Sequence, residues 1–150
     1  RALHARPRPA LPGLRVMVDH LAHVPVTGRA PDPAWVARME HFGPLPNVFC
    51  KVSRFTEQAV DQPGPLEVDY YAPTFEALWR IFGADRLAYG SNWPPCLQSG
   101  DYCATVTLAR DFFSAKGAAA VAKVMGRNAA AFYGGPRFAA LAAGVRHKRG

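Results

Sequence analysis

The chain has 150 residues, of which 49% are hydrophobic and 19% charged, so it can bury one hydrophobic core and is not a disordered segment. No apolar run approaches the ~20 residues of a membrane span, and no secretory leader pattern opens the sequence, so we expect no membrane partner. Cys50, Cys96 and Cys103 are widely spaced and form no C-x-x-C pair. This spacing suits reduced thiols and predicts a cytoplasmic protein.

The formal net charge of +7 is concentrated at the two ends of the sequence. Residues 1–15 and 137–150 together hold eight of the 18 basic residues and no acidic residue. The middle of the chain is therefore close to neutral. Basic ends can bind phosphate without specificity, but solvated ends are the interpretation we favour, and we expect no specific nucleic-acid partner.

Three short apolar runs alternate with helical patterns along the chain. In chain order the predicted elements are strand, helix, strand, helix, strand, helix, helix, over residues 14–20, 34–42, 48–53, 69–82, 86–90, 101–115 and 118–133. Asp32 is the predicted N-cap of the first helix, and Gly43 and Gly83 are expected to end the first and second. Strands that alternate with helices predict a parallel sheet.

Each predicted strand delivers polar or ionisable side chains at its C-terminal end. They are Asp19 and His20 for the first strand, Lys51 and Ser53 for the second, and Ser91 and Asn92 for the third. The carboxyl ends of parallel strands meet at one edge of a sheet, where α/β proteins place their sites. The pattern therefore predicts a site, whereas Asp85 and Arg86, before the third strand, are interpreted as a turn cap and an ion pair.

Four segments resemble the later half of an amidohydrolase-related enzyme, from the branch that includes sugar lactonases and pyrone-dicarboxylate lactonases. They are VMVDHLA at 16–22, NVFCKVS at 47–53, FGADRLAYGSNWP at 82–94 and MGRNAAAFYG at 125–134. The resemblance implies an α/β fold with parallel strands, the C-terminal part (about strands 6–8) of a (β/α)8 TIM barrel. It divides the chain into a frayed segment at 1–13, a partial barrel at 14–135 and a basic tail at 136–150.

The resemblance also implies a hydrolase that acts on a lactone or other cyclic ester of a sugar acid or small carboxylate. The family's opening strand normally supplies a His-x-His pair, and this chain has none. We therefore expect an incomplete enzyme that is weak or inactive as an isolated chain. The alternative is a non-catalytic half-barrel that assembles with a missing N-terminal half or with itself through exposed strand edges.

Family positions suggest roles for six residues. His20 would polarise a carbonyl or orient water, and Asn92 would occupy the place of the family's general base, usually Asp. An amide cannot accept a proton at neutral pH, so Asn92 is expected to hold water or a substrate hydroxyl. The predicted substrate-binding residues are Lys51, Ser53, Arg54 and Trp93. Purely structural alternatives are a loop-bonded His20, a Lys51 that extends to the surface, and a Trp93 buried against the barrel rim.

No cofactor is expected, and a divalent metal is doubtful. Catalytic zinc usually takes three protein ligands, and only His20 with His23 or Asp19 is near enough in sequence. Asn92 is a poor zinc ligand, and the lactonase-like branch is understood to work largely without metal. The predicted small-molecule partner is therefore a substrate bound by protein side chains alone.

Overall fold

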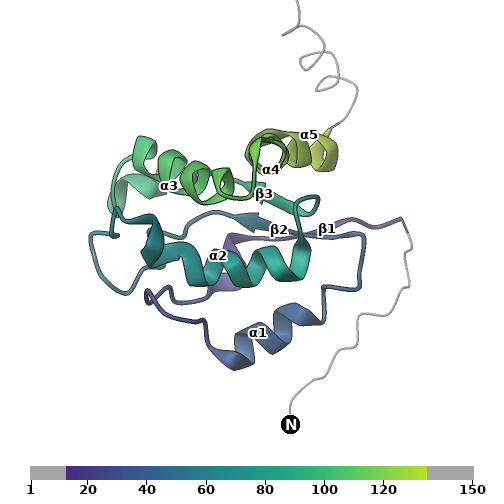
Figure 1. Cartoon of the computed structure of the whole chain (residues 1–150), viewed down its shortest axis with the longest axis horizontal. Coiled ribbons are helices and arrows are strands. Elements are labelled where there is room, and N and C mark those ends of the chain that lie inside the picture. The colour runs from purple at the N-terminus through teal and green to yellow at the C-terminus, as the bar shows by residue number, and fades with distance from the viewer. Residues whose placement is uncertain (1–12, 135–150) are drawn as a thin grey trace, which may run out of the picture.

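The computed structural model describes residues 13–134, and the trace runs from purple to yellow in Figure 1. The strands are β1 (Val16–Val18), β2 (Val48–Val52) and β3 (Leu87–Tyr89). The helices are α1 (Pro33–Glu40), α2 (Val68–Phe82), α3 (Tyr102–Ser114), α4 (Ala118–Ala122) and α5 (Asn128–Tyr133). The predicted frayed segment up to residue 12 and the predicted basic tail lie outside the described residues.

The three strands form one parallel sheet in the order β1-β2-β3, as the alternation of strands and helices predicts. The first strand is shorter than expected because its pairing begins at Val16, which lies opposite Val48, the first residue of β2. Leu14 therefore has no strand partner and remains 52% exposed. Beyond Val18 the chain turns away from the sheet.

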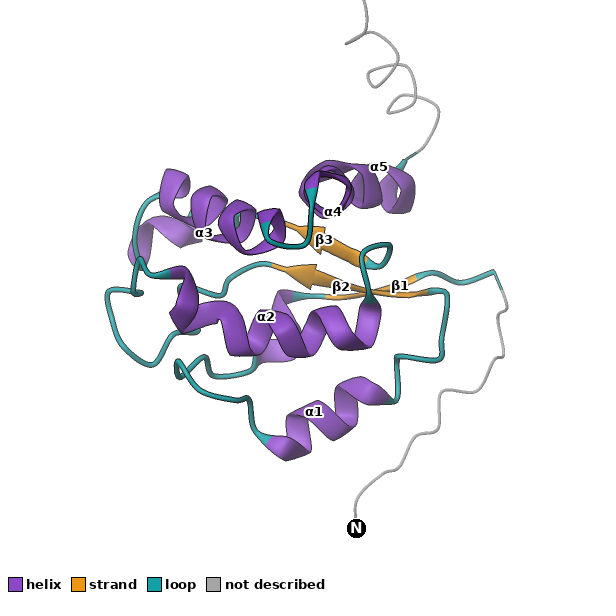
Figure 2. Cartoon of the chain, in the orientation of Figure 1, coloured by secondary structure: helices purple, strands orange, loops and turns teal. Residues whose placement is uncertain are grey.

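The two faces of the sheet carry different side chains. Along β2, Val48, Cys50 and Val52 are buried, while Phe49 and Lys51 between them are only half-buried. Period-two alternation places these two sets on opposite faces. Figure 2 shows α1 and α2 on one side of the strands and α4 and α5 on the other. Phe132 of α5 packs against Phe49, with 5.0 Å between ring centroids, so α5 reaches the second face.

Helix boundaries mostly follow the predicted capping residues. The Asp32 carboxylate accepts hydrogen bonds from the amides of Ala34 and Trp35, at 2.6 and 3.1 Å, which confirms it as the N-cap of α1. Gly83 has φ +65° and its amide donates to the carbonyl of Trp79, which ends α2 as predicted. Gly43 does not end α1, because that helix already stops at Glu40.

The last predicted helix, 118–133, is interrupted. A π-helical turn at Lys123–Arg127 separates α4 from α5. Such a turn adds one residue and so changes which face follows it. The Asn128 side chain then lies against the sheet and donates to the carbonyls of Ala84 and Leu87, both at 2.7 Å.

Arg86 anchors the N-terminal edge of the sheet. Its guanidinium donates to five backbone carbonyls, those of Phe42, Gly43, Leu45, Ile81 and Val48. The predicted ion pair of Asp85 with Arg86 is wrong, because Asp85 instead binds Lys123 at 2.6 Å. Arg86 thus links the loop before β2 to the end of α2, and these contacts fix the position of the N-terminal ends of the strands.

Two of the three cysteines are buried, and all are unpaired. Cys50 is fully buried in the core, as its place in an apolar strand predicts. Among residues 13–134, no helix has the length and hydropathy needed to cross a bilayer.

Candidate functional site

The C-terminal edge of the sheet has an unusual backbone. Within residues 13–134, every non-glycine residue with positive φ follows a strand at this edge: His20, Leu21, Ala22, His23, Arg54 and Asn92. Their φ values lie between +51° and +59°, in the left-handed region that L-residues rarely enter. Such strain persists where the surrounding structure enforces it, and it clusters at functional sites.

Residues His20–His23 form a left-handed turn directly after β1. The carbonyl of Leu21 accepts from the Trp35 indole at 3.0 Å, and the carbonyl of His20 accepts from the Gln58 amide at 3.0 Å. Leu21 itself is fully buried, which secures the turn to the core. No local sequence signal, such as Gly or Asn, marks a left-handed turn here, and the predicted first strand ran on to residue 20.

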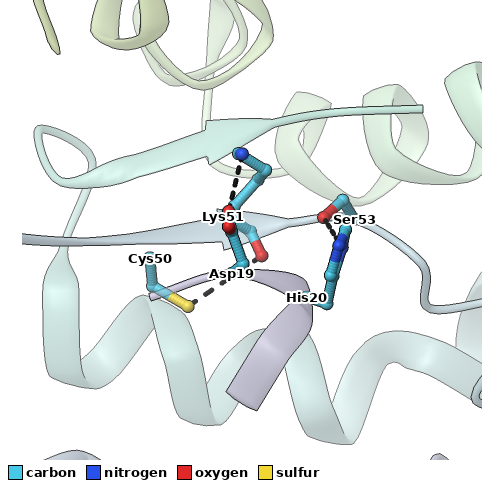
Figure 3. Close-up of polar contacts among 5 residues, drawn as sticks. All are labelled: Asp19, His20, Cys50, Lys51 and Ser53. Carbon is cyan, nitrogen blue, oxygen red and sulfur yellow. Dashed lines mark hydrogen bonds and ion pairs between the residues drawn. The ribbon is translucent and has the colours of Figure 1, made fainter. Parts of the chain in front are cut away.

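His20 faces Ser53 across the first two strand ends. His20 Nδ1 and Ser53 Oγ share a hydrogen bond of 2.9 Å, and Ser53 is 1% exposed (Figure 3). Burial lowers the pKa of His20 below its usual 6.5, and the nearby Asp19 carboxylate opposes this effect only in part. His20 is therefore a neutral imidazole at pH 7, oriented by a buried hydroxyl.

Lys51 and Asp19 form an ion pair at the same edge. Lys51 Nζ lies 2.6 Å from Asp19 Oδ1, and the two side chains point toward each other in Figure 3. Burial alone would lower the pKa of Lys51, but hydrogen bonds to Asp19 and Tyr133 raise it above its ordinary value. The Lys51 side chain is only 24% exposed, so the alternative of a lysine extending to the surface is wrong.

Asn92, after β3, binds the carboxylate of Glu57, which no sequence motif marks as a site residue. Its amide Nδ2 donates to Glu57 Oε1 at 2.6 Å, and the Thr56 hydroxyl donates to Glu57 Oε2 at 2.9 Å. Glu57 lies in the loop after β2. Its position four residues after Ser53, close to a strand end, is the signal that marks it as a candidate.

The remaining two predicted site residues lie outside these contacts. Arg54 is exposed, with φ +59°. Trp93 is 65% exposed, so the alternative of a buried tryptophan packed on the rim is wrong. The Trp93 backbone amide donates to Ser91 Oγ at 3.2 Å, which shapes the turn after Asn92. Neither side chain touches His20 or Lys51 through a hydrogen bond or ion pair among the described residues.

The three strand ends nevertheless converge on one edge. A Cβ built at Gly90 of the third strand end would lie 3.4 Å from Lys51 Cδ and 3.5 Å from Ser53 Cβ. Gln58 donates to the His20 carbonyl and is the chain neighbour of Glu57, so the His20 and Glu57 contacts share one loop. In residues 13–134, no three His, Cys, Asp or Glu side chains come together as a metal ion requires, and we derive no step through a metal.

Comparison with known proteins places this arrangement in a family. A family model described as Amidohydrolase matches residues 9–135. An L-fucono-1,5-lactonase from Burkholderia ambifaria is 37% identical over 129 residues, which cover 81% of this chain and 42% of that protein. An L-fucono-1,5-lactonase from Burkholderia multivorans is 32% identical over 76 residues, covering 49% of this chain and 26% of that protein.

A solved structure supports the same assignment. The crystal structure of an amidohydrolase from Burkholderia multivorans with bound HEPES superimposes with a TM-score of 0.72 at 25% identity, covering 82% of this chain and 45% of that one. The chain thus spans less than half the length of the relatives it matches. Because the family model matches most of the sequence and the parallel α/β arrangement agrees with a solved member, this chain belongs to the amidohydrolase family.

Proposed function

We propose that this chain carries the C-terminal strand ends of a site that hydrolyses a lactone or other cyclic ester of a sugar acid or small carboxylate. The observation that supports it most directly is the neutral His20, bonded to Ser53 at the edge where the strand ends meet. The two lactonase relatives support a sugar lactone as the substrate. A neutral imidazole is the form that can donate to a carbonyl oxygen without holding a full charge.

In this proposal the Ser53 hydroxyl donates to His20 Nδ1, and His20 Nε2–H donates to the lactone carbonyl. Water attacks the carbonyl carbon and loses a proton to a neighbouring base. The carbonyl π electrons move to the oxygen, where His20 stabilises the developing negative charge. The intermediate then collapses, the ring C–O bond breaks, and the leaving alkoxide takes up the proton to give a hydroxy acid.

The roles of the other strand-end residues follow from their contacts. Lys51 is already paired with Asp19 at 2.6 Å, so a substrate carboxylate would have to compete with that pair. We therefore assign Lys51 the role of positioning Asp19 beside the site rather than that of a free anion clamp. Arg54 and Trp93 are exposed and remain available to bind the sugar part of a substrate.

The rest of the site belongs to sequence that corresponds to the other half of the relatives. We propose that the described sheet forms part of the family barrel and that the isolated chain is weakly active or inactive. The unpaired cysteines support a reducing compartment such as the cytoplasm as the place where it works.

A chimera tests the proposal directly. The segment of the Burkholderia ambifaria lactonase that aligns with this chain is replaced by the full chain, and hydrolysis of a panel of sugar lactones is followed. We expect the chimera to hydrolyse at least one lactone and His20→Ala to lower kcat about 100-fold. His41→Ala is the matched control, because His41 is exposed at the end of α1 and its hydrogen bond in the described part of the chain goes to the Ala37 carbonyl. Equal activity of the His20 and His41 variants would reject the assignment.

A second candidate is a non-catalytic half-barrel that assembles through the outer edge of β1. This edge favours it because, within residues 13–134, β1 pairs with β2 alone, and Leu14 and Val16 beside it are 52% and 39% exposed. Sedimentation of the full chain separates the two: a dilute monomer counts against assembly, and a dimer supports it.

A further inference from the structure

One carboxylate at the C-terminal edge links two strand ends. Glu57, in the loop after β2, accepts a hydrogen bond of 2.6 Å from Asn92, which follows β3 and lies 35 residues further along the chain. It also accepts a bond of 2.9 Å from the Thr56 hydroxyl. Both donors are neutral, and among residues 13–134 the Glu57 carboxylate forms no ion pair.

Two of the other ionisable groups at this edge, Asp19 and His20, are already engaged. Asp19 is paired with Lys51, and its charge is compensated at 2.6 Å. The Nδ1 atom of His20 is bonded to Ser53, and its other nitrogen is assigned to the carbonyl in the proposed reaction. Asn92 has no basic atom, because an amide oxygen barely accepts a proton. Arg54 has no proton-accepting atom, and His23 is exposed, whereas Glu57 is held by two hydrogen bonds and can remove a proton from water.

The pairing of an amide with Glu57 has a physical reason. A second carboxylate at position 92 would place two negative oxygens about as close as the present 2.6 Å donor–acceptor distance. Two carboxylates this close share one proton at neutral pH, so one of them can no longer act as a base. An amide at the same place donates a hydrogen bond instead and orients the carboxylate. Asn92 therefore leaves Glu57 as the one carboxylate of the pair and orients it.

The loop around Glu57 is built to hold its position. Thr56 is 2% exposed, and its backbone carbonyl accepts from the Gln62 side chain at 2.9 Å. Gly64 lies so close that an added Cβ would meet the Thr56 carbonyl oxygen at 2.9 Å. Phe55 is 1% exposed and packs edge-on against Tyr71 and Phe75. A base on a loop is effective only when its neighbours fix it in this way.

We propose that Glu57 is the proton acceptor of the lactonase site and that Asn92 is its positioning residue, an assignment that rests on the function proposed above. Glu57 takes a proton from the attacking water as the new C–O bond forms at the carbonyl carbon. When the ring C–O bond breaks, the Glu57 carboxylic acid returns that proton to the leaving alkoxide. One water is consumed, one hydroxy acid is formed, and Glu57 ends as a carboxylate.

Two readouts test the assignment, and the first needs no activity. The full chain is unfolded at pH 5 and pH 8 in the wild type, Asn92→Asp, Glu57→Gln and the double variant. In Asn92→Asp two carboxylates face each other, which raises the folded pKa of one of them. The free energy of unfolding of this variant therefore falls as pH rises above ~4. The double variant restores one amide and one carboxylate, so we expect it to recover most of that loss.

The second readout is lactone hydrolysis by the chimera that carries this chain. We expect Glu57→Gln to lower kcat about 100-fold or more with KM little changed, because a base acts on the reaction and not on binding. The double variant, with its carboxylate at position 92, should recover part of that loss. Glu40→Gln is the matched control, since Glu40 is exposed and paired with Arg80 on the outer helix α1.

The possible results separate the role of Glu57, the role of Asn92 and the lactonase function. An active chimera whose Glu57→Gln variant keeps its kcat overturns the Glu57 assignment and leaves the lactonase proposal standing. An Asn92→Asp chain with no extra loss of stability at pH 8 overturns the pairing, and the positioning role of Asn92 with it. A chimera that hydrolyses no lactone overturns the proposed function and the catalytic role of Glu57 together.

Discussion

The two edges of the parallel sheet are built in opposite ways. At the N-terminal edge, Arg86 donates to five backbone carbonyls and Asn128 to two. Side chains there bind the backbone carbonyls that lack a partner in a neighbouring strand. At the C-terminal edge, left-handed residues and ionisable side chains gather, with Ser53 buried beneath them. One edge satisfies the backbone and stabilises the fold, while the other holds strain and reactive groups. In parallel α/β proteins this division separates stability from chemistry.

The largest predicted effect concerns the N-terminal edge. Arg86→Met keeps the apolar stem over the Phe82 ring, which the guanidinium now faces at 5.4 Å, but it leaves five carbonyl oxygens without this donor. The variant loses charged hydrogen bonds and leaves half-buried acceptors without a partner. We therefore expect the free energy of unfolding to fall by about 3 kcal/mol. Urea unfolding of the full chain measures it.

Arg80→Met is the control for that prediction. Arg80 is exposed and paired only with Glu40 at 3.0 Å, with side chains 64% and 54% exposed. A surface pair of this type contributes about 0–1 kcal/mol. Similar losses for the Arg86 and Arg80 variants would remove the contrast between the two edges.

A smaller effect, of opposite sign, is expected at the C-terminal edge. Ala22 is exposed and has φ +51°, so Ala22→Gly removes the steric cost of a left-handed alanine. We expect the free energy of unfolding to rise by about 0.5–1 kcal/mol. Ala37→Gly makes the same chemical change in the exposed helix α1 and should instead lower it by about 1 kcal/mol. Thermal unfolding of both variants checks the sign, and a destabilised Ala22→Gly would show that the turn stores no strain.

The smallest predicted effect is a pH dependence from His20. Its pKa is lowered in the folded state, so the unfolded chain takes up a proton first as pH falls below 6.5. The stability that His20 contributes is therefore present above pH 6.5 and declines from pH 7 to pH 5. Asp19 faces the imidazole with a charge that raises its pKa, while His23, Lys51 and Arg54 lower it. Comparison of wild type with His20→Asn at both pH values isolates this change, and a constant difference would contradict it.

Local sequence signals predicted the order of elements and the parallel sheet. These signals act over a few neighbouring residues, so the sequence alone is enough to interpret them. They are the apolar runs of three to five residues, Asp32 before Pro33, and Gly83 after an aromatic helix face. The same reasoning placed His20, Ser53 and Lys51 at one edge, because parallel strands bring their carboxyl ends together. The resemblance to the amidohydrolase family is confirmed by the family model that matches residues 9–135.

Contacts between distant segments could not be predicted in this way. Asn92 meets Glu57, Arg86 binds loop carbonyls in place of Asp85, and Lys51 finds Asp19 because of how the strands stack. The left-handed turn at His20–His23 is likewise imposed by the buried Leu21 and by bonds from Trp35 and Gln58, against the intrinsic preference of its residues. Short-range propensity and hydrophobic periodicity determined which elements form and where they end. Which side chains meet at the site was decided only by tertiary packing, because that pairing depends on segments far apart in the chain.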